Sequence, residues 1–124
     1  MRSSQGVRWK RARYEFVNLI VQAVGEGSQV VTVAVCDLKE ERYIQETQVG
    51  QGSIEAIYSA IDEMFAVEKR NLLEYRIDAV TEGIDSQAQV HVLVEFEGGV
   101  IKNGTGIDYD VLKASTKAYL QVIG

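Results

Sequence analysis

Hydrophobic positions alternate with a period of two along most of the chain. Residues 14–22 carry apolar side chains on both faces, residues 29–36 read QVVTVAVC, and a third run follows at about 42–49. Runs rich in β-branched residues are typical of strands. The pattern therefore predicts three strands in the first half of the chain, and the first of them is expected to be covered on both sides.

The period then lengthens to that of a helix. From Ile54 to Phe65, apolar residues recur at intervals of three and four, which is one stripe of an amphipathic helix. We expect Ser53 to be its N-cap. Glu55 falls in the first turn, where the helix dipole favours negative charge.

The second half repeats this order of elements. Strands are expected at 73–81, 88–96 and 100–102, with a turn at Gly83 to Ser86, and after the stretch GTGID a second helical stripe runs from position 111 to position 122. Each half therefore reads as three strands, a Gly-x-Gly stretch and a helix.

Two landmarks support a duplication. Gln29 aligns with Gln87 at an offset of 58 residues, and the Gly-x-Gly at 50–52 aligns with that at 104–106 at an offset of 54. We predict an α+β fold made of a duplicated βββα unit, in which each unit is a two-layer antiparallel sheet with one helix and the two are related by a pseudo-twofold axis. The second face of each sheet must be buried against the other half or a second subunit, which predicts a dimerising domain.

Charge separates a short arm from the rest. Five of the 13 basic residues lie within the first 13 positions, and no acid precedes Glu15, in a chain whose formal net charge is −5. We expect 1–12 to be a basic N-terminal arm or linker and 13–124 to be one domain, with halves at about 13–67 and 70–123. The acidic body does not attract nucleic acid; the arm reads as a linker or docking tail, with RNA or DNA contact as the lesser alternative.

Little in the chain points to chemistry. The single cysteine, Cys36, excludes a disulfide framework and a thiolate zinc cage, and no apolar run reaches membrane-spanning length. Cys36 and His91 read as packing or sheet-surface side chains rather than a nucleophile and a base. We expect no catalytic residues, metal or cofactor, no membrane partner, and a cytoplasmic location.

The two Gly-x-Gly stretches leave two interpretations open. Free N–H groups at a helix start can receive a carboxylate or phosphate. Alternatively, the glycines only permit a tight turn from strand to helix.

Four stretches together carry a resemblance to a known family: GQGSIEA (50–56), AVTEGIDSQ (79–87), GTGIDYD (104–110) and ASTKAYL (114–120). They resemble the C-terminal regulatory domain of alpha-isopropylmalate synthases, which some citramalate synthases share. The chain departs from the family pattern at Ser53, Glu55 and Ser86, where proline, aspartate and alanine are usual.

The resemblance implies a homodimeric regulatory module that binds a branched-chain amino acid, leucine before isoleucine, and inhibits a separate TIM-barrel acyltransferase. The competing expectation is a homodimerising module that binds no ligand. In the first case an apolar wall would hold the aliphatic chain, helix amides the carboxylate, and Glu55 or a backbone carbonyl the ammonium. The positions that the resemblance assigns to the effector site are Gly50, Gly52, Ile54, Glu55, Leu72, Tyr75, Ala79, Ser86 and Val111.

Overall fold

The computed structural model describes residues 13–79 and 86–124, so the basic arm and most of the turn predicted at Gly83 to Ser86 lie outside the described residues. The unit βββα occurs twice along the chain, as predicted. Its elements are β1 (Tyr14–Gly25), β2 (Ser28–Asp37), β3 (Arg42–Gly50), α1 (Ser53–Met64), β4 (Arg70–Ala79), β5 (Ala88–Phe96), β6 (Val100–Asp108) and α2 (Val111–Ile123).

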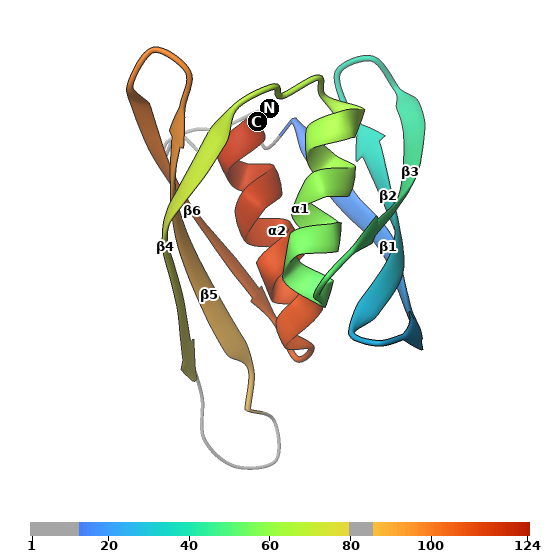
Figure 1. Cartoon of the computed structure of the whole chain (residues 1–124). Helices are drawn as coiled ribbons and strands as arrows, with labels where there is room; N and C mark the ends of the chain where they lie inside the picture. The colour runs from blue at the N-terminus through green and yellow to red at the C-terminus, as the bar shows by residue number, and fades with distance from the viewer. Residues whose placement is uncertain (1–12, 80–85) are drawn as a thin grey trace.

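Two antiparallel sheets enclose the two helices. The strand orders are β1-β2-β3 and β4-β5-β6, and Figure 1 shows α1 and α2 side by side between the sheets, both beginning at the lower end of the view. Helix α1 packs on β2 and β3, while α2 packs on β5 and β6 and also touches β1. The result is three layers, with a helix pair as the middle layer.

The core lies along the helix-facing sides of the two central strands. The inward valines of β2 and β5 are at most 2% exposed, because alternation turns every second residue toward the helices. Helix α1 buries consecutive residues, Ala56 to Tyr58, and so contacts both its sheet and α2. Two alternatives were predicted for the second face of each sheet, and burial against the other half is not the one seen, because the halves meet through their helices. Burial against a second subunit stays a prediction. Outward side chains such as Ile20 and Val49 are more than half exposed in the chain.

The second Gly-x-Gly stretch belongs to a strand. Strand β6 continues to Asp108, so the prediction of a short strand at 100–102 followed by a helix-opening turn is wrong. A Cβ at Gly104 would lie 2.2 Å from the Ala118 carbonyl oxygen, and one at Gly106 would lie 2.0 Å from that of Ala114. The two glycines are therefore what allows the backbone of α2 to approach β6 so closely.

The third strand and the helix of the two repeats are separated by the same number of residues. Strands β3 and β6 begin 58 residues apart, and so do α1 and α2. Gly104 and Gly106 thus correspond in position to Glu46 and Gln48, and the predicted alignment of the two Gly-x-Gly stretches at an offset of 54 is wrong. The duplication stands, but at these two corresponding positions only the second half has glycines that let the helix approach the strand closely.

The two helices begin differently. Gly52, with extended backbone (φ −171°, ψ 163°), is the N-cap of α1 and brings no side-chain acceptor, so the predicted cap at Ser53 is one residue too late. The N-cap of α2 is Asp110, whose Oδ1 accepts the N–H of Leu112 at 2.8 Å and that of Lys113 at 3.4 Å. Neither helix, within the described ranges, has the length and apolar character of a membrane span.

Candidate effector-binding site

Most of the predicted site positions gather at the end of the domain where both helices begin. Strand β4 ends there and β5 starts there, as Figure 1 shows at the lower edge of the molecule. Ile54 lies in the first turn of α1, and Val111 is the first residue of α2. The topology thus brings together segments far apart in sequence.

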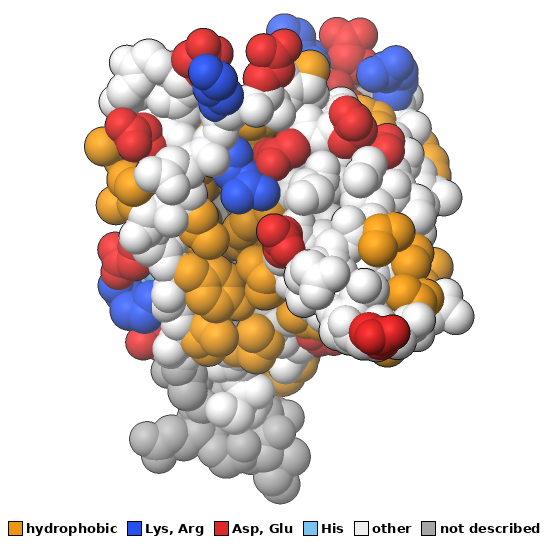
Figure 2. Space-filling model, in the orientation of Figure 1, with side chains coloured by type: hydrophobic (Ala, Val, Ile, Leu, Met, Phe, Trp, Pro, Cys, Tyr) orange, Lys and Arg blue, Asp and Glu red, His pale blue; other side chains and the backbone are white. Residues whose placement is uncertain are grey.

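The inner face of β4 supplies an apolar wall. Each helix lies over other strands, so this edge strand is only partly covered: Leu72 and Tyr75 are half-buried, and Ile77 is 49% exposed although it pairs with the fully buried Val90. Figure 2 shows hydrophobic side chains gathered on this face of the molecule, between β4 and α1. Such a surface suits an aliphatic group.

Ser115 connects the three elements that surround this wall. Its side chain, 0% exposed, lies 2.6 Å from the Tyr75 hydroxyl of β4 and donates to the Val111 carbonyl at 2.8 Å. Its backbone carbonyl accepts the Tyr58 hydroxyl of α1 at 2.9 Å. Ser115 therefore links the predicted residues Tyr75 and Val111. The sequence pattern had placed Ser115 on the second helical stripe and predicted no role for it.

A second polar cluster lies toward the other end of the helices. The Arg70 Nε donates to Asp62 Oδ2 at 2.9 Å, and the Tyr119 hydroxyl donates to the other oxygen of that carboxylate. The guanidinium lies over the Tyr58 and Tyr119 rings, 5.7 and 5.6 Å from their centroids. Burial raises the pKa of Asp62 and of both tyrosines, so the phenols stay neutral hydrogen-bond donors.

The start of α1 can offer donors to an anion. Gly52 provides no capping side chain, and a Cβ built there meets nothing within 4 Å, so the first turn is approachable. Glu55 is exposed, and its Oε1 accepts the Gln51 N–H at 3.3 Å, as an acid in a first turn commonly does. At α2, by contrast, Asp110 already occupies the first-turn amides.

Three further predicted positions lie at the same end of the domain but show no contact that points to a ligand. Gly50 ends β3 against α1, where a Cβ would come within 2.9 Å of the Ala56 backbone, so this glycine has a packing role. Ser86 is exposed just before β5. The backbone of Ala79 pairs with Ala88, and the Ala79 side chain lies outside the described residues.

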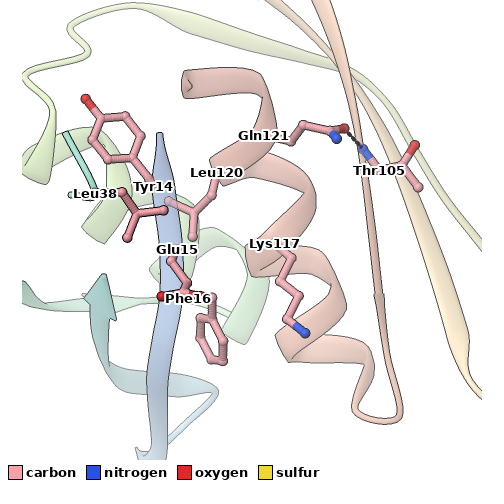
Figure 3. Close-up of a pocket in the computed structure, with 8 residues that line it drawn as sticks. All are labelled: Tyr14, Glu15, Phe16, Leu38, Thr105, Lys117, Leu120 and Gln121. Carbon is pink, nitrogen blue, oxygen red and sulfur yellow. Dashed lines mark hydrogen bonds between the residues drawn. The ribbon is translucent and has the colours of Figure 1, made fainter. Parts of the chain in front are cut away.

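A groove lies at a different place in the fold. It encloses about 670 Å³ between β1 and α2, and none of its lining residues belongs to the predicted set. Figure 3 shows these side chains, among them Gln121, whose Oε1 accepts the Thr105 N–H at 2.6 Å. Lys117 in this groove is ion-paired with Asp108 at 2.9 Å. The lining residues are Tyr14, Glu15, Phe16, Leu38, Thr105, Lys117, Leu120 and Gln121.

Residues of the types that carry other chemistry are dispersed. Cys36 is a half-buried free thiol on β2, and His91 lies on the outer face of the second sheet, its Nδ1 3.0 Å from the Thr105 hydroxyl. Within residues 13–79 and 86–124, no three His, Cys, Asp or Glu side chains are grouped as a metal site requires.

Comparison with known proteins agrees with this architecture. A family model described as the LeuA allosteric (dimerisation) domain matches residues 2–124. The chain is also similar to the 2-isopropylmalate synthases of Staphylococcus aureus strains JH9 and Newman, each 47% identical over 111 residues that make up 90% of this chain and 21% of the relative. The chain spans about a fifth of the length of these curated relatives.

Proposed function

Because the chain belongs to the LeuA allosteric (dimerisation) domain family, we propose that it binds a branched-chain amino acid and thereby regulates an acyltransferase of the 2-isopropylmalate synthase type. It contributes no catalytic residue to that reaction and acts on a separate catalytic domain. The functional form is a homodimer, with an interface built from apolar sheet faces, such as the one that exposes Ile20, Tyr43 and Val49.

One observation carries the effector part of the proposal. The partly covered apolar face of β4 extends to the end of the domain where α1 starts, and no side chain caps that helix start. A branched-chain amino acid needs both an apolar wall for its side chain and donors for its carboxylate. By the resemblance, we assign the wall to Leu72, Ala79 and Val111, and we assign the carboxylate to the first turn of α1.

Leucine is favoured over isoleucine. In the backbone register of β4, Ala79 comes two residues after Ile77, and alanine is small, so we expect this position to accept an effector side chain branched at Cγ. A bulkier residue at this position would favour a shorter effector.

A thermal shift experiment tests the proposal. Ligand that binds only the native state raises the melting temperature by mass action, so leucine at millimolar concentration should raise it, isoleucine less, and a non-branched control such as glycine not at all. Light scattering should give twice the mass of the 13.8 kDa chain. A monomer at micromolar concentration contradicts the dimer.

The alternative function is a homodimerisation module without ligand. The half-buried apolar side chains of Ile54, Leu72 and Tyr75 pack against the core, and a purely structural interface also needs such side chains. A dimer whose melting temperature does not respond to leucine, isoleucine or valine would favour this alternative.

A further inference from the structure

The groove between β1 and α2 leaves apolar side chains in contact with solvent. It encloses about 670 Å³, which is ample for a group of the size of an indole. Leu38 is 38% exposed, and Tyr14 and Phe16 are half-buried. Figure 3 shows Tyr14, Leu38 and Leu120 at one end of the groove and Phe16 farther along β1. The core is therefore incompletely covered at this place.

The charges around the groove leave one carboxylate without a counter-ion. Lys117 is ion-paired with Asp108 at 2.9 Å, and Arg13 with Asp37 at 3.1 Å. Glu15 also lines the groove; it is exposed and forms no ion pair in the part of the chain that the structure describes. The last turn of α2 has no basic residue, although the carbonyl end of a helix favours a cation. The groove thus matches an occupant that is both apolar and positively charged.

The N-terminal arm, residues 1–12, joins the domain at the mouth of this groove. The backbone carbonyl of Arg13 accepts the N–H of Leu38 at 2.8 Å. The end of α2 is also close, because a Cβ built at Gly124 would lie 3.4 Å from the Tyr14 ring and 3.8 Å from the Arg13 Cβ. The arm lies outside the described residues, but its point of attachment is beside Leu38 and the last turn of α2.

The arm has the apolar and basic residues that the groove matches. Its residues 7–10 read VRWK, in which apolar and basic side chains alternate. Trp9 is four residues from Arg13, a reach of up to about 14 Å for an extended chain. An indole that is buried on docking removes a large apolar area from water.

We propose that the N-terminal arm docks into the groove between β1 and α2 of its own chain. The Trp9 indole packs against Leu38 and Phe16, and the basic residues on either side of it lie near Glu15 and the end of α2. The match of the family model starts at residue 2, which supports assigning the arm to the domain. The groove is then an interface within the chain, and its role is separate from that of the effector site.

Fluorescence tests the proposal directly, because Trp9 is the single tryptophan of the chain. In the folded wild type, its emission should lie at shorter wavelength, and acrylamide should quench it less, than in the chain unfolded in urea. Leu38→Lys places a charge in the groove at an exposed position, so both values should move toward those of the unfolded chain. Leu73→Lys is the matched control: Leu73 is 43% exposed on β4 and does not line the groove, so both values should stay those of the wild type.

The electrostatic part of the proposal has its own pair of variants. Glu15→Lys should increase the quenching of Trp9, by less than Leu38→Lys does, and added salt should act in the same direction because it screens exposed charges. Glu63→Lys reverses an exposed acid on α1 that does not line the groove, and it should leave the quenching unchanged. Equal effects of the two reversals would remove Glu15 from the docking site.

A mixture refolded from Trp9→Phe chains and Leu38→Lys chains tests whether the arm stays with its own chain. The single tryptophan then belongs to the chain with the altered groove, so it should be as exposed as in Leu38→Lys alone. Protection of Trp9 in this mixture would show docking into a second copy and would overturn the assignment to the same chain.

Two results would overturn the docking itself. The first is a Trp9 that is as exposed in the folded wild type as in urea; if a DNA duplex then protects it, the arm is a nucleic-acid contact instead. The second is equal protection of Trp9 in Leu38→Lys and Leu73→Lys, because the arm would then be buried somewhere other than this groove. Circular dichroism of each variant establishes that it is folded before the comparison is made.

Discussion

Tyr58 of α1 stacks on Tyr119 of α2, with ring centroids 4.5 Å apart and planes inclined by 26°. Each hydroxyl bonds to the opposite helix: Tyr58 to the Ser115 carbonyl and Tyr119 to the Asp62 carboxylate. The two halves are therefore joined at the centre of the domain by a reciprocal pair of tyrosine hydrogen bonds, one near the candidate site and one near the opposite end.

Removing one hydroxyl of this pair should destabilise the domain. Tyr119→Phe leaves the partly buried Asp62 carboxylate with Arg70 as its remaining side-chain partner, at an expected cost of about 1–3 kcal/mol in the free energy of unfolding. Urea unfolding measures this. Tyr109→Phe is the control, since that ring is 67% exposed and its loss of a hydroxyl should change stability by less than about 0.5 kcal/mol. Equal stabilities of the two variants would mean that the Asp62 contact contributes nothing.

Replacing either glycine of β6 by alanine should lower the free energy of unfolding. The added Cβ would lie 2.2 Å from a backbone atom of α2 in Gly104→Ala and 2.0 Å from one in Gly106→Ala, so the helix must move. We expect each variant to lose about 3 kcal/mol or more of unfolding free energy. Gln48→Ala changes the position in β3 that corresponds to Gly106, and it should cost much less. Denaturant titration of the three variants compares them, and a tolerated Gly106→Ala would refute the close approach.

Acid should weaken the domain through Asp37. The side-chain hydrogen bonds from Arg13 and the N–H groups of Lys39 and Glu40 hold the pKa of this carboxyl below its usual value. Because the pKa of Asp37 is lower in the folded state, its ionised form stabilises the fold at pH values above about 3.9, the pKa of an unfolded aspartate. This stabilisation is lost as the pH falls through the pKa of the folded state.

The matching measurement is the unfolding free energy between pH 7 and pH 2. Asp37→Asn should lose stability at pH 7 and show a shallower decline below about pH 4 than the wild type. Arg13→Ala should act in the same direction but less strongly, because the backbone donors remain. Identical pH profiles of wild type and Asp37→Asn would exclude this carboxyl as a source of acid sensitivity.

Filling the space beside the end of β4 should reduce effector affinity. Ala79→Ile is expected to cost about 1–3 kcal/mol of leucine binding, or roughly 5- to 150-fold in affinity, while the melting temperature of the free protein changes little. Titration of both proteins with leucine and isoleucine gives the comparison. Unchanged leucine affinity in a folded variant removes Ala79 from the site, and a wild-type preference for isoleucine refutes the size argument but not the site.

The sequence predicted those strands and helices whose apolar side chains recur with the period of their element. Strand β5 was predicted at 88–96, where it is found, because its inward positions, three valines and a phenylalanine, recur at every second residue. Strand β6 was predicted too short because its inner positions are Gly104 and Gly106. Without side chains these positions carry no alternation, and a pair of glycines reads as a turn.

The candidate site shows a similar limit. Periodicity predicted that Ser115 and Tyr119 lie on the buried stripe of their helix, but periodicity does not say which neighbour covers a stripe. Whether α2 packs on α1, on its sheet or on a second subunit depends on tertiary arrangement. The roles of Ser115 and of Asp62 therefore became visible only when both helices were placed between the sheets.

The two glycines of β6 beneath α2 also limit how the two repeats can diverge during evolution. Every replacement of Gly104 or Gly106 adds at least a Cβ, so random mutation has no acceptable outcome at these positions while α2 keeps its place. The corresponding positions in β3 hold Glu46 and Gln48, whose long side chains leave many replacements open. We therefore expect Gly104 and Gly106 to change less than Glu46 and Gln48 as the two repeats diverge.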